Sequence, residues 1–266
     1  MDSKKFPSIR QAISLIALLI FLQSIGGIVF NIVIRIFFSE TKIIKYLMMN
    51  YLLPISTMGI TIYKGLHKSK QKLNEIIGIK NVNLKIYIKI LILFTGLAIV
   101  LSEVDNLIEL FIPMTDIIKN ILYNLANNNI YLVFIAIGFI GPFLEETLFR
   151  GIILRGFLKS YKDWKAILIS SILFGIVHLN IWQMISAIIF GVFLGWIYYK
   201  TNSLLTVIFA HCVNNILALI AYHFIDIPGF NGIFSSQLQP FWFTFMGLLL
   251  LIFGSILFSN YSLKNK

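Results

Sequence analysis

Long apolar segments recur along this chain, and they constrain its fold more than any other feature. A helix needs about 20 apolar residues to cross a hydrocarbon core about 30 Å thick. Runs of that length lie at about residues 11–38, 43–63, 86–112, 129–155 and 239–259. We therefore expect an all-α fold in which these runs are membrane-spanning helices.

Residues 166–222 are expected to supply three more spans. The stretch 166–199 is too long for one span and slightly short for two, which predicts a tight hairpin turning near Leu179–Trp182. A further span covers about residues 203–222. The chain is therefore expected to be a polytopic helical bundle of about eight transmembrane helices, forming a single integral membrane domain over residues 1–266.

The composition supports a membrane protein and excludes several other classes. Hydrophobic residues make up 58% and charged residues 12% of the chain, against about 25% charged residues in soluble domains. The single cysteine, Cys212, excludes an internal disulfide framework and a multi-cysteine metal site. The net charge of +11 comes from short basic clusters between apolar runs, which favours lipid headgroups and not nucleic acid as the partner.

Basic residues are concentrated in alternate loops, which predicts the orientation of the bundle. The loops after the second, fourth and sixth predicted spans and the C-terminus contain Lys64, Lys68, Lys70, Lys72, Lys80, Arg155, Lys159, Lys162, Lys165, Lys200, Lys264 and Lys266. The other regions contain Glu103, Asp105, Glu109, Asp116 and Asp226, with Lys42 and Lys45 as mild exceptions. Because Lys-rich and Arg-rich loops stay in the cytoplasm, both termini are expected to be cytoplasmic. The mixed polar and apolar pattern of residues 113–129 predicts a short helix on the outer interface.

Three charged residues, Glu145, Glu146 and Arg150, interrupt the apolar stretch at about residues 129–158. A charged side chain at bilayer depth costs roughly 2.5 to 3.5 kcal/mol on insertion scales, so three in one span indicate a function inside the protein. Residues four apart share a helix face, so Glu146 and Arg150 are expected to form an ion pair. Glu145 lies about 100° further round the helix and is left as the freer carboxylate.

Two later spans carry polar side chains at comparable depth. Measured along each helix from its cytoplasmic end, Glu145 lies roughly 15 Å deep and His178 roughly 18 Å deep. His211 and Asn215 lie roughly 12 and 18 Å deep and share a helix face. Hydrolysis of a peptide needs a base, a water and donors for the developing negative charge, and these residue types suit that chemistry.

These residues resemble the motifs of a known family of intramembrane endopeptidases, the CAAX-protease and bacteriocin-processing family, also called CPBP or Abi. Glu145–Arg150 matches its Glu-Glu-x-x-x-Arg motif, Phe174–His178 its Phe-x-x-x-His motif and His211–Asn215 its His-x-x-x-Asn motif. All three in this order, on separate apolar spans, are far more specific than any one of them. The resemblance covers about residues 140–220, and we assign a protease core to about residues 129–222.

The resemblance implies an eight-helix protease with a conical cavity inside the membrane. It implies that Glu145 activates the attacking water with the help of His178, and that His211 and Asn215 stabilise the oxyanion. Glu146 and Arg150 are implied to hold the first glutamate in place. Two His and one Glu are also a known set of zinc ligands, but the resemblance implies a glutamate mechanism, so we expect no metal and no other cofactor.

The same residues allow other interpretations. A proton-coupled transporter would use Glu145, His178 and His211 as a relay at the membrane midplane, although the chain shows no inverted repeat. A catalytically silent scaffold or immunity protein would need only structural roles from the six residues. In that case Glu146 and Arg150 would fix helix packing, and the remaining polar groups would join helices by hydrogen bonds.

The expected partners are the lipid bilayer and a membrane-associated peptide or protein. The family includes enzymes of the CAAX type and of bacteriocin or pheromone maturation. The abundance of Ile, Lys and Asn suggests an AT-rich, bacterial coding sequence, which favours an unprenylated peptide or leader segment in a bacterial cell membrane. We expect cleavage near the cytoplasmic half of the bilayer. The sequence leaves the oligomeric state open.

Overall fold

The computed structural model describes residues 6–38, 45, 47–77, 83–126, 129–231 and 237–261, and within these ranges the chain forms helices and turns but no β-strand. The elements in chain order are α1 (Ile9–Phe37), η2 (Met48–Leu52), α3 (Leu53–Ser69), α4 (Leu73–Ile77), α5 (Leu84–Phe111), α6 (Asp116–Ala126), α7 (Ile130–Ile135), η3 (Ala136–Ile140), α8 (Gly141–Glu146), η4 (Thr147–Leu154), α9 (Arg155–Phe157), α10 (Asp163–Ile176), α11 (Ile181–Thr201), α12 (Leu204–Phe224) and α13 (Phe241–Ser259). The label η marks π-helical segments. The predicted all-α fold is confirmed.

Six helices of the described chain are long and apolar enough to cross a membrane: α1, α5, the continuous helix Ile130–Phe157, α11, α12 and α13. The other two predicted spans correspond to shorter helices, α3 with 17 residues and α10 with 14. α3 follows the π-helical segment η2 and continues to Ser69, beyond the predicted end at about residue 63. The polytopic bundle is confirmed, whereas the count of eight spans stays a prediction.

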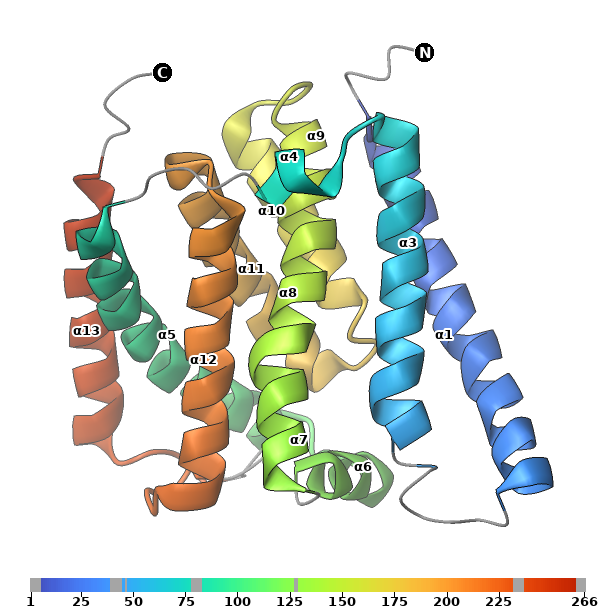
Figure 1. Ribbon diagram of the computed structural model, residues 1–266. Helices are drawn as coiled ribbons and strands as arrows, with labels where there is room; N and C mark the ends of the chain where they lie inside the picture. The colour runs from blue at the N-terminus through green and yellow to red at the C-terminus, as the bar shows by residue number, and fades with distance from the viewer. Residues whose placement is uncertain are drawn as a thin grey trace.

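The two ends of the bundle differ in charge. α1 begins and α13 ends at the same end, together with α4 and α9 (Figure 1). We call this the basic end, because α9, the first turn of α10 and the connection between them carry Arg155, Lys159, Lys162 and Lys165. α6 lies across the opposite end, beside the start of α7, where the sequence predicts a short interfacial helix (Figure 1).

The assignment of the basic end to the cytoplasm stays a prediction, since no membrane is present in the structure. Several of the charges on which it depends, Lys42, Lys80, Lys264 and Lys266, lie outside the described residues.

Glycines allow α5 and α13 to pack closely at one edge of the bundle. A Cβ atom on Gly254 of α13 would lie 2.6 Å from the Cα of Leu93 on α5. A Cβ atom on Gly96 of α5 would collide with the backbone of Leu251. Small residues of this kind bring membrane helices into backbone contact. The contact anchors α5, whose other face lines the candidate site.

The predicted hairpin within residues 166–199 is present. α10 ends at Ile176 and α11 begins at Ile181, so the turn falls slightly earlier than predicted. Leu179 adopts a positive φ of 55°, and the Asn180 side chain caps α11 by accepting a hydrogen bond of 2.8 Å from the backbone N–H of Gln183. The turn carries His178 to the candidate site.

One stripe of α10 is exposed along its whole length. It consists of Trp164, Leu168, Ile172 and Ile176, which follow one another at intervals of four residues and are 66%, 41%, 38% and 40% exposed. All four side chains are apolar, so this face is suited to lipid. The 14 residues of α10 extend for about 21 Å at the usual helical rise, which is less than the thickness of a hydrocarbon core.

Candidate active site

The helix that carries the two glutamates is interrupted by π-helical segments on both sides of them. In η3 the N–H of Gly141 bonds to the carbonyl of Ala136, five residues back. The next residue, Pro142, has no N–H, so the carbonyl of Ile137 lacks the donor that the π-helical pattern would supply. The Asn215 side chain takes this place: its Nδ2 donates to the Ile137 carbonyl at 2.8 Å. This bond joins α12 to the interrupted helix and orients Asn215.

The ion pair predicted between Glu146 and Arg150 is present. Both residues are 0% exposed, and Nη1 of Arg150 lies 3.0 Å from Oε1 of Glu146. The other terminal nitrogen of Arg150 donates to the carbonyl of Gly191 on α11 at 3.0 Å. The guanidinium carbon lies 4.6 Å from the centre of the Phe174 ring, a cation–π distance. Arg150 therefore connects the interrupted helix to both α10 and α11.

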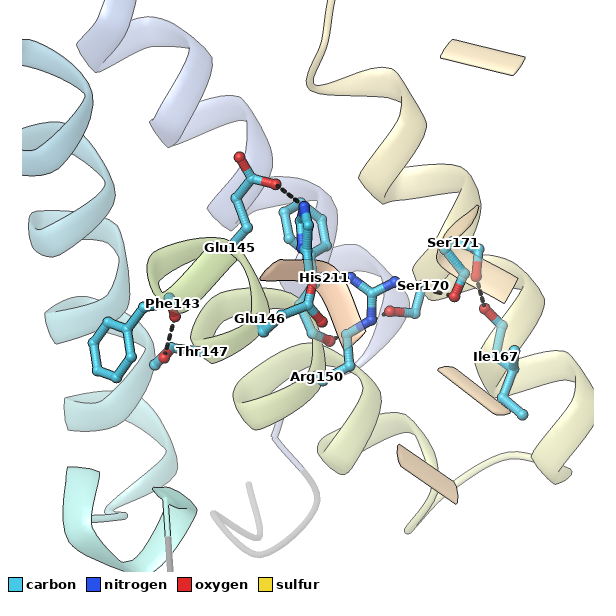
Figure 2. A network of polar contacts seen from close by, with 11 residues as sticks. Phe143, Glu145, Glu146, Thr147, Arg150, Ile167, Ser170, Ser171 and His211 are labelled. Carbon is cyan, nitrogen blue, oxygen red and sulfur yellow. Dashed lines mark hydrogen bonds and ion pairs between the residues drawn. The ribbon is translucent and has the colours of Figure 1, made fainter. Parts of the chain in front are cut away.

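The buried ion pair extends directly to His211. Oε1 of Glu146, the oxygen that Arg150 contacts, lies 2.7 Å from Nδ1 of His211. Because a carboxylate paired with Arg150 accepts hydrogen bonds, Nδ1 is the donor and the other ring nitrogen, Nε2, is turned towards Glu145. The ring of His211 lies between the two glutamates (Figure 2). The family resemblance implies that Glu146 holds Glu145 in place, whereas the hydrogen bond that the structure shows is to His211.

The two adjacent glutamates occupy different environments. The Glu146 side chain is fully buried, whereas the Glu145 side chain is 27% exposed. Oε2 of Glu145 lies 3.9 Å from Nε2 of His211, which is beyond hydrogen-bonding distance (Figure 2). Glu145 is therefore the freer carboxylate, as the helical spacing predicts.

Aromatic rings hold the two histidines in place. The ring of Phe174 meets that of His178 edge-on at 5.4 Å between centroids and that of His211 at 6.0 Å. Phe190 on α11 packs edge-on against His211 at 4.9 Å. Phe174 thus lies next to both histidines and Arg150, which gives this position of the Phe-x-x-x-His pattern a packing role.

A cavity of about 470 Å³ brings these groups together. Its lining includes Glu145, His178, His211 and Asn215, while Glu146 and Arg150 lie buried behind it. The structure thus brings all six residues predicted from the sequence into one region. The cavity also extends to other elements, where it is lined by Ser102, Asp105, Asn106, Leu122, Ser186, Tyr222 and Phe230.

The acidic residues of α5 correct one expectation from the sequence. The charge pattern of the sequence counts Glu103, Asp105 and Glu109 among the regions poor in basic residues, whereas all three lie within the membrane-spanning helix α5. Asp105 and Asn106 line the cavity. A signal for this was available, because Ser102, Asp105, Asn106 and Glu109 are three, four and seven residues apart and share a helix face. The apolar run concealed that pattern.

Two His and one Glu were considered above as zinc ligands. In the described part of the chain, no group of three or more His, Cys, Asp or Glu side chains is arranged to hold a metal ion.

Residues 127–217 match a family described as "Type II CAAX prenyl endopeptidase Rce1-like". A protein of Bacillus subtilis (strain 168) named "Putative membrane peptidase YdiL" is 34% identical over 89 residues. That match spans 34% of this chain and 36% of the relative, so it covers about a third of the length of each. No solved structure matches the chain.

The fold and site define a polytopic helical membrane protein with a buried Glu, Arg and His network beside a cavity. The matched segment contains all three motifs that resemble those of the CAAX-protease and bacteriocin-processing family, and both matches support that resemblance.

Proposed function

We propose that this protein is an intramembrane endopeptidase that hydrolyses a peptide bond with a water activated by Glu145. One observation carries the proposal: a partly exposed carboxylate lines a cavity 3.9 Å from a histidine nitrogen whose ring is fixed by a second, buried glutamate. The peptidase names of the matched family and of the Bacillus subtilis relative support it.

The gap between Glu145 and His211 suits a water molecule. A separation of 3.9 Å is too long for a direct hydrogen bond, but a water can lie about 2.8 Å from both atoms. In the proposed reaction, Glu145 takes one proton from this water as its oxygen attacks the carbonyl carbon. The same carboxyl then gives the proton to the leaving nitrogen as the C–N bond breaks. His178, which lines the same cavity, assists in orienting the water.

His211 and Asn215 are proposed to stabilise the oxyanion. Nδ2 of Asn215 has two protons, and the bond to the Ile137 carbonyl uses one, so the other is available to a bound substrate. Nε2 of His211 donates only when the ring carries both protons, since Nδ1 donates to Glu146. Oxyanion stabilisation by His211 therefore belongs to its doubly protonated form. Glu146 and Arg150 act as positioning residues, because they fix the ring through the buried ion pair.

The proposed substrate is a membrane-associated peptide or leader segment in a bacterial cell membrane. The lining of the cavity includes Phe174, Phe190, Leu219 and Tyr222 beside the polar groups, which suits an apolar segment with one exposed peptide bond.

The test compares membrane peptides from cells that make the wild type, Glu145→Ala or Glu75→Ala at matched levels. Glu75 is an exposed glutamate on α4 and is the matched control. Mass spectrometry of chain ends should show new termini with the wild type and Glu75→Ala but not with Glu145→Ala. Identical termini in all three strains would refute the protease. A difference in an ion or solute gradient would instead favour a transporter.

A further inference from the structure

A second polar region lies in the cavity, on the side of α5. The Asp105 carboxylate accepts a hydrogen bond through Oδ1 from the hydroxyl of Ser186 on α11. Both residues line the same cavity as Glu145 and His211. The α5–α11 contact made by this bond forms part of the cavity wall.

Asp105 differs from the other acids of α5, because the part of the chain that the structure describes places no cation and no N–H donor beside its carboxylate. Glu109 forms an ion pair of 2.7 Å with Lys119 and accepts the N–H of Met114 at 3.0 Å. Glu103 accepts from the Asn106 side chain at 3.1 Å and from the N–H of Gln239 at 2.9 Å. For Asp105, the described residues provide the Ser186 hydroxyl and no ion pair.

Asp105 lies within a helix suited to crossing the membrane, where a carboxylate without an ion pair is unusual. α5 is one of the six helices suited to crossing a membrane, and Asp105 lies within it. A carboxylate inside a membrane protein is costly unless a cation or several donors accompany it, and residues that bear this cost generally serve a ligand. A cationic group brought by a substrate would supply a charge-assisted hydrogen bond at this point.

The distance from Asp105 to the proposed reaction centre can be followed along α11. Ser186, the partner of Asp105, lies one helical turn, roughly 6 Å, from Phe190. The Phe190 ring is 4.9 Å from the ring of His211. Asp105 is therefore on the order of 10 Å from His211, and an extended peptide covers roughly 3.3 Å per residue. A substrate group at Asp105 would belong to a residue about three positions from the cleaved bond.

We propose that Asp105 is a specificity-determining residue that binds a positively charged group of the substrate, about three residues from the cleaved peptide bond. This rests on the proposed function and names the class of substrate: an apolar peptide with one ammonium or guanidinium group. That group is a Lys or Arg side chain or the free N-terminal amine, which have the same chemistry for a carboxylate.

The test exposes the purified protein in lipid nanodiscs to a defined library of apolar peptides. Its members differ at single positions by Lys, Arg, Gln or Leu and are made with free or acetylated N-termini. We expect the wild type to cut cationic peptides about tenfold faster than their Gln counterparts, as suits one hydrogen bond to a charged group. Asp105→Asn keeps an acceptor for Ser186 and removes the charge, and should abolish this ratio. Asp105→Glu should partly restore it.

Asp163→Asn is the matched control, because it makes the same change on the exposed first turn of α10 at the basic end. It should leave the ratio as in the wild type. Acetylation of the N-terminus distinguishes a Lys or Arg side chain from the N-terminal amine as the bound cation. If acetylation removes the faster cleavage and a change of Lys or Arg to Gln does not, the bound cation is the N-terminal amine.

Peptide binding, measured separately from cleavage, tests the role of Asp105 independently of the protease activity. Retention of the same peptides is measured on Glu145→Gln protein, with and without Asp105→Asn. Cleavage without a cationic preference would overturn the role of Asp105 and leave the protease intact. Retention of cationic peptides that depends on Asp105, without cleavage by the wild type, would overturn the protease and leave the binding site. Absence of both preference and retention would overturn the inference.

Discussion

Glu145 and Glu146 are adjacent in sequence, yet their surroundings give them opposite properties. Glu146 is enclosed with Arg150 and His211, so its charge is compensated inside the protein. Glu145 faces the cavity and has a histidine at 3.9 Å. Of the two carboxylates, only Glu145 lines the cavity.

These environments predict different effects of the same substitution. Glu145→Gln should lower cleavage by about 10²-fold or more, the usual contribution of a general base, with little change in thermal stability. Glu146→Gln leaves Arg150 buried without its counter-charge and should destabilise the protein by about 3–5 kcal/mol. Peptide cleavage and thermal unfolding in nanodiscs measure the two effects. An equal loss of stability in both variants would contradict the distinction.

Single residues were predictable where helical spacing alone determines a contact. The pairing of Glu146 with Arg150 follows from an interval of four residues. The bond from Glu146 to His211 joins residues 65 positions apart, so the sequence could bring both to one depth but could not select the partner. The contact of Asp105 with Ser186 likewise joins residues 81 positions apart, on α5 and α11, so the sequence could not select it.

At the scale of an element, the interrupted helix Ile130–Phe157 is the feature that the sequence concealed. Its position follows from hydropathy, but its π-helical segments η3 and η4 depend on partners elsewhere in the fold. Pro142 removes a donor for the Ile137 carbonyl, and Asn215, 78 residues beyond Ile137, supplies one. The presence of Pro142 in the sequence predicts an interruption of the helical hydrogen bonds, but not which distant side chain replaces the missing donor.

Pro142→Ala tests this arrangement. The substitution restores an N–H that competes with Asn215 for the Ile137 carbonyl and favours a regular α-helix. Stability should stay equal or rise, while cleavage should fall roughly tenfold or more because the glutamates and Asn215 change their relative positions. Cleavage rate and thermal unfolding are again the measurements. Pro54→Ala, at the start of α3, is the control for loss of a proline. Full activity in Pro142→Ala would show that cleavage does not require the π-helical segment.

For the whole molecule, the basic residues at one end of the bundle predict its orientation in the membrane. That orientation in turn predicts the side of the membrane from which the cavity is reached. The lining of the cavity includes Glu145 and also Leu122 on α6. α6 lies at the end opposite the basic one (Figure 1). If the basic end is cytoplasmic, water and polar parts of a substrate reach Glu145 from the outer side of the membrane. Cleavage near the cytoplasmic half of the bilayer, as expected from the sequence, stays a prediction.

The single cysteine makes the orientation measurable. In a Cys212→Ala background, Ile117→Cys on α6 should react with a membrane-impermeant thiol reagent in intact cells. Lys159→Cys, in the connection between α9 and α10, should react only after permeabilisation. The reverse pattern would invert the bundle and place the α6 end in the cytoplasm.

The short helix α10 has a consequence for the surrounding lipid. The helix that carries the exposed apolar stripe has only 14 residues, and the turn that follows carries Leu179, which is 65% exposed. The apolar surface of this face is shorter than the hydrocarbon thickness of the bilayer, so the bilayer must become thinner beside it. A bilayer of short-chain lipids removes that distortion, whereas a thick, ordered bilayer increases it. The position of His178, at the tip of this hairpin, is thereby coupled to the thickness of the membrane in which the protein resides.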